Sequence, residues 1–342
     1  MEFKLAEVFF PNSCTEQAIF SFCDQVSSHS NADELLINFS NLGRIEPFTM
    51  VYVAKFIRDF SRENPKVNTS AIGHHEKTYA ANMAFFRAFG LKHGREPNCT
   101  NGNGNFVPYT ILRVQTIVDE AGKEWDVEQN IIEKRAEHLA QILSRQDSSH
   151  LVDALTFSIR EVLRNVFEHS NSKTIEYCAQ YWPAYNKVEI AVVDNGIGLG
   201  ASLKDNPFVQ VDSHCDAIQQ ALMPAISSKN YKGAVIDKDD PWHNSGFGLY
   251  MINRICRLGG SFTLCTGNHG IRLDESGKTH IDLPHLCRGT AVRMVLNTNR
   301  LTKLSEMLSE FRDEGYEIAK QIKGVGIYTA SAASQMLSRD FK

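Results

Sequence analysis

Two hydrophobic patterns alternate along the first third of the chain. Residues 34–39 form a short run with an apolar centre, which is typical of a buried strand, and residues 67–72 predict a second strand. Residues 47–60 and 79–89 carry apolar side chains at helical spacing, so each predicts a helix with one face in a core. This alternation predicts an α/β domain, which we place at residues 1–118.

The rest of the chain repeats these patterns with longer elements. Residues 98–105 are rich in asparagine and glycine, which predicts a surface loop, and residues 109–118 alternate like a strand. Residues 125–145 predict a helix, and the period-2 pattern of residues 188–193 predicts a strand that Asp194 follows at once. The sequence therefore predicts an α+β protein with a second domain at residues 119–298 and a C-terminal helical extension at 299–342.

Composition narrows the classes of partner. The chain of 342 residues has 36 basic and 40 acidic residues, a net charge of −4 that offers no broad cationic surface to nucleic acid. It has neither a signal-peptide pattern nor a run of about 18 apolar residues, so we expect a cytoplasmic protein without a membrane partner. Its eight cysteines form no C-x-x-C pair, which argues against a disulfide framework or a zinc ribbon.

Three short stretches bring together residue types that suit a phosphate ligand. Glu161 and Asn165 are four residues apart on a predicted helix, so they share one face. Asp194 stands at a strand end and is followed at once by Asn-Gly-Ile-Gly. Gly246 and Gly248 open an apolar-periodic helix, whose unpaired N–H groups attract anions while the glycines permit close approach.

The order of these stretches resembles the GHKL family of ATP-binding domains, which includes gyrase-type topoisomerases, ninety-kilodalton chaperones, MutL proteins and histidine kinases. The resemblance covers residues 125–298. It rests on four motifs, namely Glu-x-x-x-Asn at 161–165, Asp-x-Gly-x-Gly at 194–198, Gly-x-Gly-Leu at 246–249, and Gly289-Thr290 before an apolar strand. It implies an α/β sandwich of the Bergerat type, in which the residues between the second and third motifs form a mobile lid over the nucleotide.

The resemblance also implies a site for ATP and Mg²⁺. In that site Asp194 accepts a hydrogen bond from the adenine amine, and Gly196 and Gly198 leave room for the base. Asn165 ligates Mg²⁺, and Glu161 is the general base that activates the attacking group. The other residues that we assign to ATP are Lys229 in the lid, Gly246, Gly248 and Leu249 at the helix start, and Thr290 on the closing strand.

Several histidines and cysteines suggest other chemistry, which we weigh against simpler roles. His280, His285 and Cys287 could form a metal cluster, but apolar residues separate them and no fourth ligand is near, so we favour a strand-end surface. His169 ends the Glu161 helix, and we interpret it as a solvated or capping residue. A phosphoacceptor histidine requires an upstream dimerisation hairpin with a different pattern.

Residues 33–60 also resemble STAS domains, the small α/β regulators that include anti-sigma-factor antagonists. Such antagonists carry a phosphorylatable Ser or Thr before the helix that follows this strand. Here Glu46, Pro47 and Phe48 occupy that neighbourhood, and Thr49 is the nearest hydroxyl. This departure from the pattern argues against a phosphoacceptor.

Three functions remain open. The first is an ATPase-type conformational switch in bacterial regulation, and the second is a serine/threonine protein kinase, because EVLRNVFEHS at 161–170 resembles the motif of anti-sigma-factor kinases. The third is a nucleotide sensor with negligible turnover. Each implies a protein partner. The apolar face of a helix predicted at 298–322 (Leu301, Leu304, Met307, Leu308, Phe311) either packs on its own domain or forms a homodimer.

Overall fold

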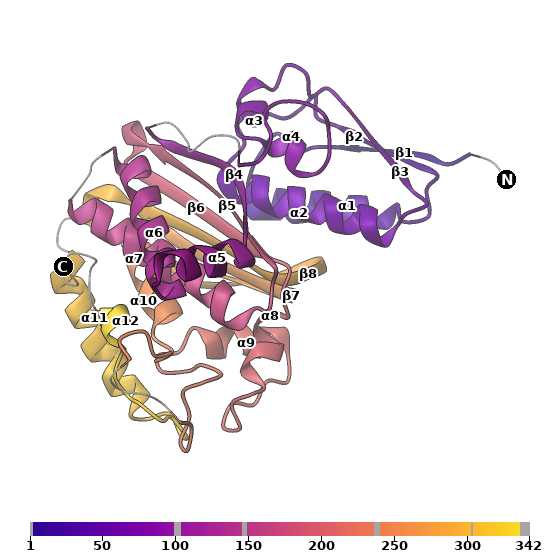
Figure 1. Cartoon of the computed structure of the whole chain (residues 1–342). Helices are drawn as coiled ribbons and strands as arrows, with labels where there is room; N and C mark the ends of the chain where they lie inside the picture. The colour runs from indigo at the N-terminus through magenta and orange to yellow at the C-terminus, as the bar shows by residue number, and fades with distance from the viewer. Residues whose placement is uncertain (1–2, 99–103, 146–148, 236–239, 302–303, 336–342) are drawn as a thin grey trace.

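The computed structural model describes residues 3–98, 104–145, 149–235, 240–301 and 304–335. These residues form a mixed structure of helices and sheets, in agreement with the predicted α+β class (Figure 1). Among them no helix is long and apolar enough to cross a bilayer. The predicted loop at 98–105 and the predicted lid both include residues outside these ranges. The side chain of Leu304 and the residues beyond 335 also lie outside the described part.

The N-terminal unit contains a three-stranded parallel sheet in the order β1-β2-β3, with helices in the connections. The predicted helix at 79–89 is two short helices, because Ala84 adopts a left-handed conformation (φ +63°) between them. The elements are β1 (Leu5–Phe9), α1 (Glu16–Ser28), β2 (Glu34–Asn38), α2 (Pro47–Glu63), β3 (Asn68–Ile72), α3 (Thr78–Asn82) and α4 (Phe85–Ala88).

The second unit is built on a five-stranded antiparallel sheet in the order β4-β5-β6-β8-β7. Its strands are β4 (Phe106–Arg113), β5 (Thr174–Trp182), β6 (Lys187–Asp194), β7 (Ser261–Asp274) and β8 (Gly277–Asn297). β4 pairs with β5, so this sheet begins before the domain boundary that we placed at residue 119. The strand predicted at 109–118 ends at Arg113, and its last residues belong to a helix.

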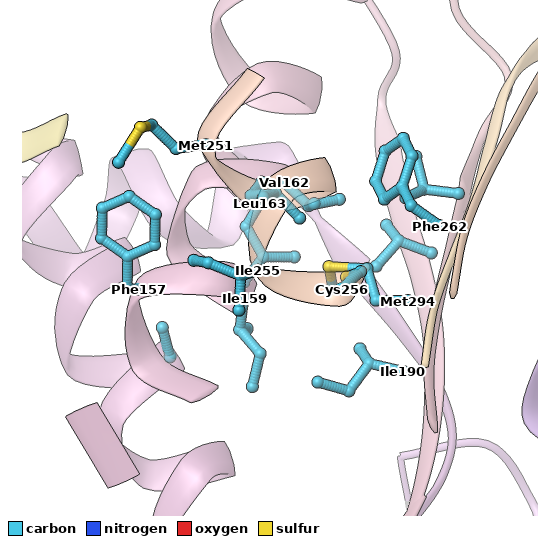
Figure 2. Close-up of a cluster of buried hydrophobic side chains, with 14 of the residues drawn as sticks. Phe157, Ile159, Val162, Leu163, Ile190, Met251, Ile255, Cys256, Phe262 and Met294 are labelled. Carbon is cyan, nitrogen blue, oxygen red and sulfur yellow. The ribbon is translucent and has the colours of Figure 1, made fainter. Parts of the chain in front are cut away.

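Helices cover one face of this sheet. They are α5 (Val114–Glu124), α6 (Glu128–Ser144), α7 (His150–His169) and α10 (Gly248–Cys256). The helix predicted at 125–145 begins three residues later, because Trp125 is left-handed (φ +53°) and ends α5. Figure 2 shows the core between the layers, where Phe157 and Met251 from the helices face Ile190 and Met294 from the strands.

The N-terminal unit covers the opposite face of the five-stranded sheet. α1 contacts β8, and α2 contacts β5, β6 and β8 (Figure 1). Apolar residues of both units, including Cys178, Ala191 and Val193 on the sheet, form one continuous buried cluster. The two units predicted from the sequence therefore share a core.

A buried ion network crosses this contact. The Phe48 N–H at the start of α2 donates to Glu189 Oε1 (3.0 Å), and Arg293 Nη2 donates to Glu189 Oε2 (2.9 Å) and to Glu46 (2.6 Å). Lys187 lies 3.3 Å from Glu189. Burial alone would raise the pKa of Glu189, but the charges of Arg293 and Lys187 outweigh it and hold that pKa below its ordinary value.

The remaining elements lie at both ends of the strands and beyond the sheet. α8 (Gly198–Leu203) and α9 (His214–Ala221) lie in the segment predicted as a lid, and the turns η1 (Pro183–Tyr185) and η2 (Thr298–Arg300) follow β5 and β8. α11 (Leu304–Ala319) packs against α10 of the same chain, with Leu308 and Phe311 in the core. α12 (Ala332–Gln335) ends the described chain.

Candidate functional site

A pocket of about 760 Å³, its open mouth included, lies between α7, the end of β6 and the start of α10. The three motifs separated in the sequence meet here, because each stands at the end or on the inner face of an element that borders the pocket. Seven of the assigned residues line it, namely Asn165, Asp194, Gly198, Gly246, Gly248, Leu249 and Thr290. Val162, Val166, Leu199, Leu203, Ile226, Leu264 and Val292 add an apolar lining.

Asp194 presents a buried carboxylate to the pocket. Its side chain is held at the strand end, where Oδ1 accepts a hydrogen bond from the Gly196 N–H (2.6 Å). Burial raises the pKa of Asp194 to about 6, although hydrogen bonds from Gly196 and Thr290 lower it. Such a group accepts hydrogen bonds from a ligand at neutral pH inside a largely apolar cavity.

Gly196 does not line this pocket, but the structure explains why a glycine is needed. A Cβ at this position would overlap the carbonyl oxygen of Ser170 at the end of α7. Gly198 has φ +74°, and a Cβ there would lie 2.8 Å from Thr266 Oγ1. The two glycines thus let the chain turn closely past α7 and β7 while the Gly196 N–H fixes Asp194.

Asn165 faces the start of α10. Its buried Nδ2 has no hydrogen-bond partner among the described residues, and it lies 3.7 Å from the position that a Cβ on Gly248 would take. Buried amide groups are normally hydrogen-bonded, so this atom marks a place for a ligand. The helix-start N–H groups around Gly248 border the same volume and attract anions.

Glu161 lies beside this region but outside the pocket lining. Its Oε1 accepts a hydrogen bond from Arg160 Nε (3.2 Å) and lies 3.6 Å from Arg164 Nη1. Its Oε2 accepts from the Ser334 hydroxyl (3.2 Å) and would lie 2.5 Å from a Cβ on Gly248. The helix face shared by Glu161 and Asn165 is as predicted, but the two arginines and Ser334 engage the carboxylate.

Lys229 does not line the pocket either, and its side chain is exposed. The loop that carries it is fixed by its neighbour Asn230, which is 1% exposed. Asn230 Nδ2 lies 2.9–3.0 Å from the carbonyl oxygens of Ala225, Ser245 and Ile327, which share its two N–H donors. The segment predicted as a lid is therefore fastened to a later part of the chain at this point.

That later part is the segment from Gly324 to Ser334, which no sequence motif connects with the site. Ser331 and Ser334 are buried, and their hydroxyls form a chain from Ser245 through Ser331 (3.5 Å) and Ser334 (3.3 Å) to Glu161. Arg160 Nη2 donates to the carbonyl of Ala333. The segment has no regular apolar period, so no sequence pattern could have placed it.

His169 is a further pocket residue that we had interpreted as solvated or capping, and that interpretation is wrong. It lines the pocket, with Nδ1 3.2 Å from the Ser228 hydroxyl and Nε2 in contact with Asn244. Burial lowers its pKa to about 4, so the imidazole is neutral at physiological pH. It acts there as a hydrogen-bonding group that joins α7 to Ser228 in the middle of the lid segment and to Asn244 at its end.

The structure also separates the cluster considered at 280–287. His285 Nε2 lies 2.8 Å from the Tyr52 hydroxyl in the contact with α2, and Cys287 is buried nearby. His280 instead meets two residues from elsewhere, Cys215 and His269. In the N-terminal unit Thr49 is 1% exposed, which argues further against a phosphoacceptor at this position.

Comparison of the chain with protein-family models and with curated proteins finds no match.

Proposed function

We propose that this protein binds ATP with Mg²⁺ in the pocket and works as an ATPase-type conformational switch. One observation carries the proposal. The buried Asn165 Nδ2, which has no hydrogen-bond partner in the described part of the chain, lies beside the start of α10, in the same cavity as the buried carboxylate of Asp194. A ligand with a hydrogen-bond donor at one end and phosphates at the other would satisfy both. The motif order that resembles GHKL domains favours ATP as that ligand.

The adenine ring would lie at the Asp194 end of the pocket. Asp194 would accept the hydrogen bond of the adenine amine, since Gly196 and Thr290 already orient the carboxylate. Leu199, Leu264 and Val292 provide apolar surface around it. A guanine ring presents a carbonyl oxygen where adenine has its amine, and two acceptors facing one another are unfavourable. The site is therefore expected to select adenine.

The phosphates would lie toward α10. Helix-start N–H groups, with Gly246 and Gly248 permitting close approach, would hold them. The Asn165 atom without a partner among the described residues is Nδ2, a donor that suits a phosphate oxygen. With the amide turned so that Oδ1 faces the cavity, Asn165 would instead offer hydrated Mg²⁺ a ligand of the type this ion accepts. When bound, Mg²⁺ would partly neutralise the triphosphate.

Glu161 would serve as the general base through Oε2. Oε1 is anchored by Arg160 and lies near Arg164, so the carboxylate has a fixed orientation in which Oε2 faces the start of α10. A proton taken from the attacking water would pass to Oε2. The switch itself would work through Asn230, because movement of the lid loop must pull on the segment that contains Ile327.

One observation favours the kinase alternative. The Ser334 hydroxyl already donates a hydrogen bond to Glu161 Oε2. In an autophosphorylation, Ser334 Oγ would bond to the γ-phosphorus and pass its proton to Glu161 Oε2. The bond from that phosphorus to the bridging oxygen would break, and ADP would leave. A partner's serine could take the same position if the segment moved away.

Incubation with γ-labelled ATP and Mg²⁺ tests both candidates. Free labelled phosphate supports the ATPase, label on this chain at Ser334 supports autophosphorylation, and absence of both refutes turnover. Glu161→Ala should keep nucleotide affinity and reduce turnover by roughly 10²–10⁴, the usual contribution of a positioned general base. Asn165→Ala should instead weaken Mg²⁺-dependent ATP binding. Equal turnover in wild type and Glu161→Ala would remove Glu161 from the chemistry.

A further inference from the structure

Three metal-ligating side chains converge at the base of the lid segment, away from the pocket described above. Cys215 lies in the first turn of α9, His269 on β7 and His280 on β8. Their donor atoms all lie within 4.8 Å of one another, and this is the only such group found among the described residues. His269 pairs with Asp282 across the hairpin, so the His280 imidazole is its diagonal neighbour on the same face.

The separations fit a tetrahedral metal site. His269 Nε2 lies 3.0 Å from His280 Nδ1, and Cys215 Sγ lies 3.6 Å from the same nitrogen. With the usual Zn–N and Zn–S bond lengths, a tetrahedral site separates two nitrogens by roughly 3.3 Å and a nitrogen from a sulfur by about 3.6 Å. A shift of a few tenths of an ångström would bring the two imidazoles to this separation, and the third pair of donor atoms, on Cys215 and His269, lies within 4.8 Å.

Neighbouring groups support the ligands in the way that metal sites require. Asp282 Oδ1 lies 3.2 Å from His269 Nδ1, on the ring nitrogen opposite Nε2. A carboxylate there fixes the imidazole tautomer with Nε2 free for the metal. Gln219 Nε2 donates to Cys215 Sγ (3.2 Å) and would stabilise a thiolate. His280 is exposed, so the fourth position faces solvent.

We propose that Cys215, His269 and His280 bind one divalent cation of the zinc class, with the fourth position open to water or an external ligand. One thiolate and two imidazoles select Zn²⁺ over Mg²⁺ or Ca²⁺, which prefer oxygen. Binding releases the Cys215 thiol proton. The proposal does not depend on nucleotide binding, because none of the three ligands lines the nucleotide pocket.

The ion would join α9 to the β7–β8 hairpin. α9 belongs to the segment between the second and third motifs, and its last residue, Ala221, lines the nucleotide pocket. A cross-link at the first turn of α9 would hold this side of the pocket against the sheet. Zn²⁺ should therefore slow amide hydrogen exchange in α9 of the wild type and leave exchange in His280→Ala unchanged.

Titration of the full chain with Co²⁺, after removal of metals by chelation and dialysis, tests the site. We expect saturation at one ion per chain, a thiolate-to-cobalt charge-transfer band and the intense visible bands of four-coordinate cobalt. Zn²⁺ should abolish these bands. Cys215→Ser should lose the charge-transfer band, His280→Ala should lose tight binding, and Asp282→Asn should weaken binding by about tenfold, as for other outer ligands.

Cys14→Ser is the matched control, because Cys14 is a half-buried thiol in the N-terminal unit and should leave every cobalt band in place. A charge-transfer band that is absent from the wild type, or that persists in Cys215→Ser, would overturn the proposal. His280 is exposed, so His280→Ala should fold, as circular dichroism can verify. If Cys215→Ser fails to fold, His280→Ala decides the question: wild-type Co²⁺ affinity in that variant refutes the site.

Discussion

Replacing Asp194 by asparagine should weaken nucleotide binding and at the same time stabilise the ligand-free protein. The pKa of this carboxyl is about 6 in the folded chain, against an ordinary value of 3.8. Since each pKa unit corresponds to about 1.36 kcal/mol, holding the ionised group in the fold costs about 3 kcal/mol at neutral pH. Asparagine has nearly the same shape and carries no charge, so it avoids this cost.

The sign of the pH dependence follows from the raised pKa. The folded state binds the proton more tightly than the unfolded state, so stability falls as pH rises from 3.8 to 6 and then stays constant. Asp194→Asn should therefore be more stable than wild type by up to about 3 kcal/mol above pH 6. This advantage should shrink as pH falls through that window and disappear below it.

The binding loss has a separate magnitude. A hydrogen bond to a charged group contributes roughly 1.5–3 kcal/mol, and the substitution also offers a donor to the adenine amine. Adenosine affinity should fall at least tenfold, and wild-type affinity should itself decline below about pH 6 as Asp194 is protonated. Adenosine is the preferred probe, because it has no phosphate to titrate over this range.

Urea unfolding at pH 7.5 and pH 4.5 measures the first effect, and calorimetry with adenosine measures the second. Asp205→Asn is the control, because Asp205 is an exposed aspartate that follows α8. This substitution should change neither the stability nor the adenosine affinity. A variant less stable than wild type at pH 7.5 would show that the carboxylate is a structural group, contrary to the reasoning. Unchanged adenosine affinity would show that the adenine ring does not bind at Asp194.

Three further predictions follow from other contacts. Gly248→Ala should keep adenosine binding but reduce ATP turnover, because the added Cβ would lie 2.5 Å from Glu161 Oε2. An equal loss of adenosine affinity and of ATP turnover would contradict this prediction. Glu189→Gln should lower the free energy of unfolding by roughly 1.5–3 kcal/mol at pH 7, because Arg293 exchanges a charged acceptor for a neutral one while Glu46 and Glu16 remain; for the wild type, this contribution should disappear as pH falls through the lowered pKa of Glu189. Light scattering at micromolar concentration should give a monomer with and without ATP, because α11 packs on α10 of its own chain.

The sequence predicted the pocket residues that stand at the ends of regular elements. Asn165 could be placed because four-residue spacing fixes a helix face, and Asp194 could be placed because a period-2 strand ends there. The order of the motifs then indicated that they meet. These predictions needed only local geometry, and the structure brings both residues to one cavity.

Other features depend on contacts between distant segments. Ser334 reaches Glu161 from a stretch without periodicity, and no spacing rule connects the two. The packing of the N-terminal unit on the second face of the sheet is visible in the sequence, because Ala191 and Val193 make the second face of β6 apolar as well. Strands apolar on both sides are typical of sheets buried on both faces. That pattern could have predicted that the N-terminal unit packs on the sheet.

The position of Ser334 gives the two proposed reactions opposite responses to one substitution. In the kinase reaction its hydroxyl is the acceptor, so Ser334→Ala should eliminate label on the chain. In the ATPase reaction the same hydroxyl donates a hydrogen bond to Glu161 Oε2, the oxygen that must receive a proton from water. Ser334→Ala would then free that oxygen and increase phosphate release. Since Arg160 and Arg164 still hold Oε1 in the variant, the orientation of Glu161 should persist. Loss of label on the chain would therefore show that Glu161 activates the Ser334 hydroxyl, and increased phosphate release would show that it activates water.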